Sequence, residues 1–237
     1  MRDRIIVALD TNSAEAALSI VRDLSGEVGM FKVGMELFPR GGPELIREIR
    51  STDAKVFLDL KFHDIPNTVA GAVRSAAALG VTFATLHATG GRAMLRAAAE
   101  AAGGTGLTLL AVTVLTSLDD DDLAEVGFRS SAGESVLRLA ELAAGERVGG
   151  IVCSAREVEA VRGRLGPGPV LVTPGVRLPE DETGDQKRVV TPYEAVRRGA
   201  DYLVVGRPIT RATDPVAAAR IFAAEMSRGL EGRGNTA

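Results

Sequence analysis

The chain of 237 residues is 46% hydrophobic and 25% charged, with a formal net charge of -3 at pH 7. This composition is typical of a globular protein with a substantial core, and it argues against a polymeric nucleic acid as a partner. No apolar run approaches the roughly 18 residues of a membrane span, and Met1 to Arg4 lead into a strand pattern rather than a signal-peptide core. We therefore expect a cytoplasmic protein that does not bind membranes.

Eight short apolar runs recur along the chain, with polar residues or glycine clustered at their ends. Nearly continuous apolar runs of this length predict parallel strands buried on both faces. They are Ile5 to Asp10, Met30 to Gly34, Lys55 to Lys61, Phe83 to His87, Thr108 to Leu115, Gly150 to Ser154, Val170 to Val176 and Tyr202 to Gly206. The segments that follow them have helical spacing: Ser13 to Leu24, Pro43 to Arg50, Val69 to Leu79, Arg92 to Ala102, Ser135 to Ala144, Ala155 to Leu165, Pro192 to Gly199 and Pro215 to Arg228.

This alternation predicts an α/β fold, a (β/α)8 TIM barrel in a single domain, since the eight units average about 30 residues each. A doubly wound open sheet is the alternative. The barrel is favoured because polar residues cluster at the strand ends and no Gly-x-Gly-x-x-Gly follows the first strand. We assign residues 1–228 to the barrel and expect residues 229–237 to be a frayed tail.

The third run ends in charges that a buried strand normally excludes. Residues two apart on a strand face the same side, so Asp59 and Lys61 are expected to share one pocket. Asp64, in the loop beyond the strand, can supply a second carboxylate from another direction. An ordinary salt bridge at a strand end is the simpler interpretation of the Asp-x-Lys pair taken alone.

Other polar residues have structural explanations. His63 and His87 lack the spacing of a zinc site, so we predict no metal, and His63 is expected to be a hydrogen-bonded structural residue. Cys153 lies within an apolar strand and is expected to be a buried thiol rather than a nucleophile. Ser117 is expected to cap a helix whose first turn carries the acidic residues 119–122.

The ends of the last two runs predict a phosphate site. Pro174-Gly175-Val176-Arg177 ends the seventh run and Val205-Gly206-Arg207-Pro208 ends the eighth. Barrels commonly hold phosphate in these two loops, where glycine lets backbone amides approach and arginine adds a charged fork. Either motif alone would be read as a surface turn. The long segment from Leu178 to Val190, which contains Gln186, is the predicted loop that closes over a ligand.

These motifs together resemble the orotidine 5′-phosphate decarboxylase family, and the resemblance spans all eight units. Its residues are Asp59-x-Lys61-x-x-Asp64-Ile65-Pro66-Asn67-Thr68, Lys32, Leu115-Thr116-Ser117, Gly184-Asp185-Gln186 and the two arginine motifs. The Asp-x-Lys-x-x-Asp core is shared with related barrels that decarboxylate or condense sugar phosphates. The Asp-Ile-Pro-Asn-Thr extension and Gly-Asp-Gln are more specific.

The resemblance implies a cofactor-free enzyme of pyrimidine synthesis that converts orotidine 5′-monophosphate to uridine 5′-monophosphate and CO2. Lys61, held by Asp59 and a second carboxylate, would attract the developing carbanion and protonate C6. Lys32 would complete a network of paired charges. Of the binding residues, Asp10 and Lys32 would hold the ribose, Thr116 the pyrimidine edge, and Arg177, Gln186, Gly206 and Arg207 the phosphate. Asp64 and Thr68 would come from the partner in a homodimer with shared active sites.

Two other hypotheses stay open. A magnesium-dependent sugar-phosphate decarboxylase or aldolase would require a carboxylate at the end of the second strand, where this chain has Lys32, an ammonium that repels cations. A non-catalytic binder of phosphoribosyl ligands would need the phosphate site, but it would have no use for Asp59, Lys61 and Asp64 together.

Overall fold

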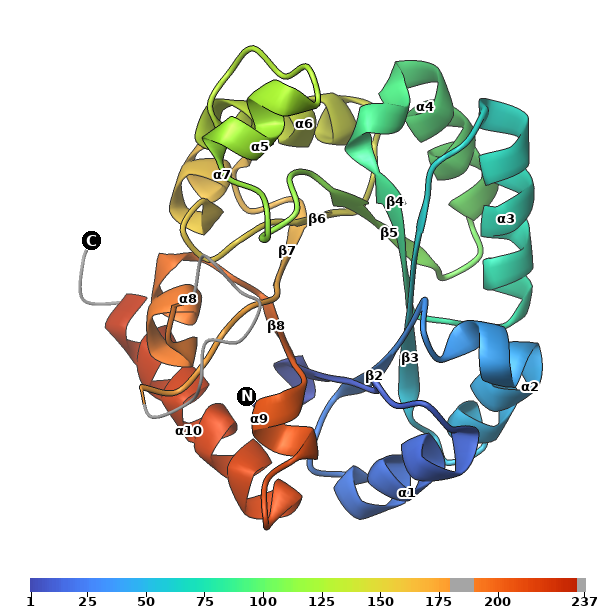
Figure 1. The fold of residues 1–237 in the computed structure, drawn as a ribbon, viewed down its shortest axis with the longest axis vertical. Coiled ribbons are helices and arrows are strands. Elements are labelled where there is room, and N and C mark those ends of the chain that lie inside the picture. The colour runs from blue at the N-terminus through green and yellow to red at the C-terminus, as the bar shows by residue number, and fades with distance from the viewer. Residues whose placement is uncertain (180–189, 234–237) are drawn as a thin grey trace.

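Eight parallel strands form a closed barrel with helices around its outside (Figure 1). The structure, a computed structural model, describes residues 1–179 and 190–233. Each strand pairs with the next along the chain and β8 pairs with β1, which confirms the predicted TIM barrel and excludes the open sheet. The strands are β1 (Ile5–Ala8), β2 (Met30–Gly34), β3 (Lys55–Phe62), β4 (Phe83–His87), β5 (Thr108–Val112), β6 (Gly150–Val152), β7 (Val170–Thr173) and β8 (Tyr202–Val205).

The helices follow the strands as the sequence pattern predicts. They are α1 (Ala14–Leu24), α2 (Phe38–Arg50), α3 (Pro66–Ala78), α4 (Gly91–Ala102), α5 (Asp120–Glu125), α6 (Ala132–Gly145), α7 (Val158–Leu165), α8 (Pro192–Arg198), α9 (Arg207–Thr210) and α10 (Pro215–Arg233). Two short 3-10 turns, Arg2–Arg4 and Ala88–Gly90, precede β1 and α4. No helix within the described residues is long and apolar enough to cross a membrane.

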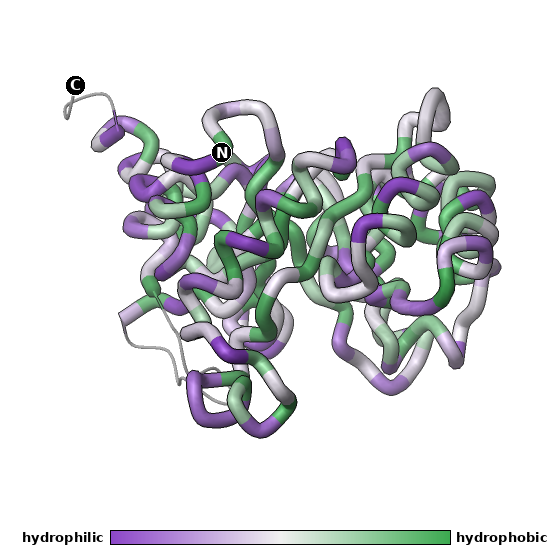
Figure 2. Tube along the Cα trace, turned by 90° about the horizontal axis from the view of Figure 1, so that it is seen from above, coloured by the Kyte–Doolittle hydropathy of each residue, from purple (hydrophilic) through white to green (hydrophobic). Residues whose placement is uncertain are grey.

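Side chains alternate between two cores because each strand is buried on both faces. Ile5 and Val7 belong to the core between strands and helices, whereas Ile6 belongs to the core inside the barrel. Along the outer helices, hydrophobic and hydrophilic residues alternate, as expected for helices that cover a sheet on one side only (Figure 2). Inside the barrel, Phe83 packs edge-on against Phe57 and Tyr202, with ring centroids 6.1 and 5.3 Å apart. These rings fill the barrel interior below the C-terminal strand ends.

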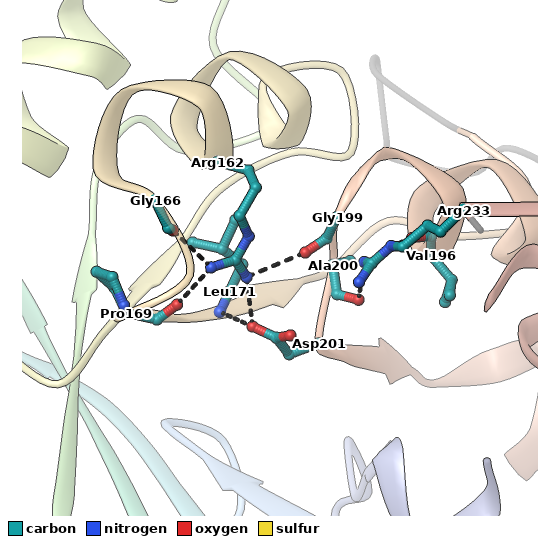
Figure 3. Close-up of polar contacts among 9 residues, drawn as sticks. All are labelled: Arg162, Gly166, Pro169, Leu171, Val196, Gly199, Ala200, Asp201 and Arg233. Atoms are coloured by element: carbon teal, nitrogen blue, oxygen red, sulfur yellow. Dashed lines mark hydrogen bonds and ion pairs between the residues drawn. The ribbon is translucent and has the colours of Figure 1, made fainter. Parts of the chain in front are cut away.

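A polar network ties together the N-terminal ends of β7 and β8 (Figure 3). The carboxylate of Asp201, just before β8, accepts the backbone N–H of Leu171 in β7, at 2.8 Å. The Arg162 guanidinium donates to four oxygens, which are the carbonyls of Gly166, Pro169 and Gly199 at 3.0, 3.0 and 3.1 Å and the Asp201 carboxylate at 2.6 Å. One arginine therefore joins the end of α7, the end of α8 and the starts of two strands.

The C-terminal helix is longer than the sequence pattern predicts. α10 continues to Arg233, whose guanidinium donates to the carbonyls of Val196 and Ala200 (Figure 3). Gly229 lies against α8 so closely that a Cβ there would be 2.4 Å from the Tyr193 carbonyl oxygen. The predicted frayed tail is therefore wrong for residues 229–233, because packing against α8 overrides the helix-breaking tendency of glycine; residues 234–237 lie outside the described part.

Candidate active site

A row of four alternating charges lies at the C-terminal ends of β1, β2 and β3. Lys32 Nζ is 3.1 Å from Oδ1 of Asp10 and 3.5 Å from Oδ2 of Asp59. Lys61 Nζ is 2.9 Å from Oδ1 of Asp59. The structure thus brings together four residues that the sequence analysis placed in the site, in the order acid, amine, acid, amine.

Asp59 is the centre of this row. Its side chain is only 13% exposed. Burial, the largest influence, opposes its ionisation, but the charges of Lys32 and Lys61 and hydrogen bonds from Lys61 and Thr85 together outweigh burial and lower the pKa of Asp59. A mostly buried carboxylate is therefore held between two ammonium groups.

Lys61 lies in an irregular part of β3. Leu58 pairs with Ala84 and Phe62 with Leu86, so β3 advances four residues while β4 advances two, and the ladder bulges in between. Lys61 itself has φ 52°, a left-handed conformation that is unfavourable for residues other than glycine. The expectation that Asp59 and Lys61 share a pocket is confirmed, but the bulge, rather than simple alternation along a regular strand, aims Lys61.

Thr85 on β4 is a site residue that the sequence analysis missed. It is 1% exposed, its hydroxyl donates to Oδ1 of Asp59 at 2.9 Å, and its Oγ1 accepts the backbone N–H of Lys61 at 2.9 Å. Its position could have indicated this role, because Thr85 places a hydroxyl in the middle of the apolar run Phe83 to His87, where a buried polar group requires hydrogen-bond partners.

An inner cavity of about 220 Å³ opens beside the charged row. Its polar lining consists of Lys32, Asp59, Lys61 and Thr116. Its remaining wall is apolar and is formed by Phe57, Val112, Val114, Leu115, Val152, Cys153, Pro174 and Val204. A charged wall that faces an apolar one suits a flat ring with one reactive, charged edge. Cys153 is 1% exposed, so the predicted burial of its thiol is confirmed.

An outer cavity of about 520 Å³ adjoins the inner one, since Lys32, Pro174 and Val204 line both. Three guanidinium groups, from Arg177, Arg207 and Arg211, line it together with the carboxylates of Asp10 and Glu36. A cavity with this set of forked donors is suited to a phosphate group. Arg211 was missed, although its spacing of four residues from Arg207 indicates one face of a helix.

Two glycines shape the outer cavity. Gly175 has φ 73°, which favours glycine, and it turns the chain after β7. Gly206 precedes the short helix α9 and lines the cavity beside Arg207. Beyond the turn, the backbone N–H of Arg177 donates to the Val190 carbonyl at 3.2 Å, so the two ends of the predicted closing loop lie side by side. Gln186, within that loop, lies outside the described residues.

Asp64 and Thr68 are not brought into this site within one chain. Asp64 is exposed on the segment that joins β3 to α3, Thr68 is exposed in the first turn of α3, and neither lines the inner or the outer cavity. Oδ1 of Asp64 accepts the backbone N–H of Ile65 at 2.6 Å.

The two histidines come together although they are far apart in the sequence, with ring centroids 5.4 Å apart. Burial, followed by the neighbouring charges of His63 and Lys61, lowers the pKa of His87. Among residues 1–179 and 190–233, no cluster of three or more histidine, cysteine or acidic side chains could hold a metal ion.

The acidic run 119–122 begins α5, as predicted. The cap of this helix is Asp119 rather than Ser117, because Asp119 and Asp122 form a reciprocal capping box.

Comparison with known proteins agrees with this geometry. Residues 3–222 match the family described as "Orotidine 5'-phosphate decarboxylase / HUMPS family". The chain belongs to this family. It is 51% identical over 240 residues to an orotidine 5′-phosphate decarboxylase of Syntrophus aciditrophicus, covering 98% of this chain and 96% of that protein. An Anaeromyxobacter sp. relative of the same name is 54% identical over 224 residues, covering 94% and 98%.

A solved structure has the same fold. The crystal structure of orotidine 5′-phosphate decarboxylase from Lactobacillus acidophilus superimposes with a TM-score of 0.83 at 40% sequence identity, covering 94% of this chain and 98% of that one. The agreement therefore extends over nearly the whole length of both proteins.

Proposed function

We propose that this protein is an orotidine 5′-phosphate decarboxylase, a carboxy-lyase that forms uridine 5′-monophosphate and CO2 in pyrimidine biosynthesis without a cofactor. The observation that carries the proposal is the charged row Asp10, Lys32, Asp59 and Lys61: its last three residues line a largely apolar inner cavity, and Asp10 and Lys32 line the outer one. Family membership and relatives of that name at about half identity support the same reaction.

Binding follows from the two adjoining cavities. The phosphate is assigned to the outer cavity, where Arg177 and Arg207 supply charge and Gly206 allows close approach. The pyrimidine is assigned to the inner cavity, against its apolar wall and beside Thr116. Asp10 and Lys32, which lie where the cavities meet, are assigned to the ribose hydroxyls. Gln186 is proposed as a further phosphate ligand.

Lys61 is proposed as the proton donor. The bond between C6 and the carboxylate breaks, its electron pair stays on C6, and CO2 leaves. The Lys61 ammonium, already oriented by Asp59 at 2.9 Å, stabilises that charge and then transfers a proton to C6. The neutral amine regains its proton from water after the product leaves. Asp59, on the same wall, faces the substrate carboxylate and favours its departure as CO2.

The charged row also separates this function from the alternatives. A magnesium-dependent sugar-phosphate enzyme needs carboxylates free to bind the cation, but the Lys32 ammonium lies between Asp10 and Asp59. A non-catalytic binder needs the arginines of the outer cavity and has no need of an amine held against a carboxylate in the inner one.

The deciding experiment follows the absorbance of orotidine 5′-monophosphate with purified protein, with and without a chelator. We expect full conversion to uridine 5′-monophosphate at the same rate in both samples. Activity that disappears with chelator and returns with Mg²⁺ would favour the magnesium enzyme. Binding of the product without any turnover would favour the non-catalytic binder.

We propose in addition that the active protein is a homodimer with shared sites. Exposed apolar side chains of Met35 and Ile65, at 58% and 68%, follow the adjacent strands β2 and β3, as expected for a surface that a second copy covers. Asp64 and Thr68 are exposed beside Ile65 and would enter the partner's site, giving Lys61 its second carboxylate.

Mixing two inactive variants tests this shared site. In a mixed dimer of Lys61→Ala and Asp64→Ala, one site carries both substitutions and the other carries neither. Random pairing makes half of the dimers mixed, so co-refolding should restore roughly a quarter of wild-type activity. Mixed dimers that form without activity would place Asp64 in its own chain's site.

We also propose a cytoplasmic location, because neither the substrate nor the product is bound to a membrane. Cell fractionation checks this proposal.

A further inference from the structure

Thr85 connects the two groups that the reaction uses. Its hydroxyl has one hydrogen to donate, which goes to Oδ1 of Asp59 at 2.9 Å, and a lone pair that accepts the Lys61 backbone N–H, also at 2.9 Å. The same Oδ1 of Asp59 accepts from Lys61 Nζ. Three groups from two strands thus form one closed set of hydrogen bonds.

The bulge in β3 explains why a side chain is needed there. Between the pairs Leu58–Ala84 and Phe62–Leu86, residues 59–61 of β3 have only Thr85 opposite them. Regular ladder hydrogen bonds cannot form across such a mismatch, so a backbone N–H in the bulge needs another partner. Thr85 Oγ1 supplies it at Lys61, the residue whose φ of 52° is left-handed.

We propose that Thr85 is a positioning residue for the decarboxylation: it holds the Lys61 backbone in its left-handed conformation and orients the Asp59 carboxylate toward the Lys61 ammonium. Asp59 and Lys61 line the inner cavity, whereas Thr85 lies behind them, so it acts through them rather than on the substrate. Its effect on turnover rests on the proposed function.

Other buried threonines show what an ordinary structural role looks like. Thr113 donates its hydroxyl to the Val152 carbonyl at 3.1 Å, which ties two strands together and involves no charged group. Thr173 is fully buried, and its hydroxyl has no hydrogen-bond partner within the described residues. At both positions a threonine serves packing or strand pairing, while at Thr85 both hydrogen bonds of the hydroxyl involve site residues.

The test compares Thr85→Val with Thr173→Val, since each replaces a buried hydroxyl by a methyl group of similar shape. For Thr85→Val we expect kcat to fall about 10- to 100-fold, as for loss of a hydrogen bond to a charged group. Affinity for uridine 5′-monophosphate should change less than about threefold, because the outer cavity is untouched. Thr173→Val should keep wild-type kcat, and Thr85→Ser should recover most of it.

Wild-type kcat in Thr85→Val, or an equal loss in Thr173→Val, would overturn the proposal. Should Thr85→Val fail to fold, Thr85→Ser and Thr85→Ala provide the same comparison, because both remove the methyl group and only serine keeps the hydroxyl. Equal kcat in that pair would likewise overturn it.

The pKa of Asp59, measured in the absence of substrate, tests the role of Thr85 independently of the proposed decarboxylase activity. The Thr85 hydrogen bond is one of the causes that lower the pKa of Asp59. Carbon-13 NMR titration should therefore give a higher Asp59 pKa in Thr85→Val than in wild type or Thr85→Ser. If the wild-type protein did not decarboxylate the nucleotide, the proposed function would fail, but this titration would still test the role of Thr85. An Asp59 pKa that is the same in Thr85→Val and in wild type would count against that role.

Discussion

The two ends of the barrel both carry ion networks, but they use them differently. At the N-terminal end, the Arg162 guanidinium meets three carbonyls and the Asp201 carboxylate, all supplied by the protein (Figure 3). At the C-terminal end, Lys32 and Lys61 share Asp59, and all three line an open cavity. The first network uses its donors to join elements, whereas the residues of the second line a cavity that can receive a ligand.

This difference teaches how to distinguish a structural charge cluster from a functional one. Distances do not separate them, since both contain contacts below 3 Å. What separates them is where the groups lie: the first network is enclosed by backbone carbonyls, whereas the second lines a cavity and includes Lys61, whose backbone is left-handed.

The largest expected effect is the loss of Lys61. Lys61→Ala should lower kcat at least about 10⁴-fold, because it removes both the proton donor and the charge that stabilises the carbanion. Binding of uridine 5′-monophosphate, measured by calorimetry, should stay detectable. Lys55→Ala, at the exposed first residue of β3, is the control and should remain fully active. Near-normal turnover by Lys61→Ala would mean that the charge network at the C-terminal end of the barrel is structural, like the one at the N-terminal end.

Arg207→Ala should have the next largest effect, about 100-fold or more on kcat/KM for the nucleotide. The phosphate-free nucleoside should react at nearly the same slow rate with variant and wild type, since binding energy from the phosphate is what Arg207 contributes. Steady-state kinetics on both substrates provides the comparison. An equal loss on both would mean that Arg207 supports the fold, as Arg162 does at the other end.

Arg162→Ala should affect stability instead of chemistry. We expect the free energy of unfolding to fall by about 2–4 kcal/mol, because carbonyls and a carboxylate lose their shared donor. kcat at a temperature well below the melting point should be unchanged. Arg164→Ala on the same helix removes only an exposed pair with Glu141 and should cost less than about 1 kcal/mol. Chemical denaturation measures both; equal losses would contradict the structural role.

The smallest expected effect is a pH-dependent difference in stability at Asp59. Its pKa is lowered in the folded protein, so its stabilising contribution is complete above the unfolded value of about 3.9 and is lost as pH falls through the folded value. The difference in unfolding free energy between wild type and Asp59→Asn should be constant from about pH 5 to 8 and shrink below about pH 4. A difference that persists unchanged at pH 3 would rule this out.

Much of the fold follows from the sequence by itself. Buried parallel strands require nearly continuous apolar runs, so the eight runs could be located, and each overlaps an observed strand. The pairing of Asp59 with Lys61 was equally predictable, because both belong to one short segment. Lys32 and Asp10 were placed with them by the family resemblance, and the structure puts them on β2 and just after the neighbouring β1.

Contacts between distant segments were decided only by the tertiary structure. Thr85 reaches Asp59 and Lys61 across a register shift that no local pattern encodes, and Arg162 meets Asp201 from 39 residues away. The extension of α10 to Arg233 likewise depends on the close approach of Gly229 to α8. Apolar periodicity is a local property and reveals which face of an element is buried; the partner of each buried polar group depends on the register and packing of the assembled barrel.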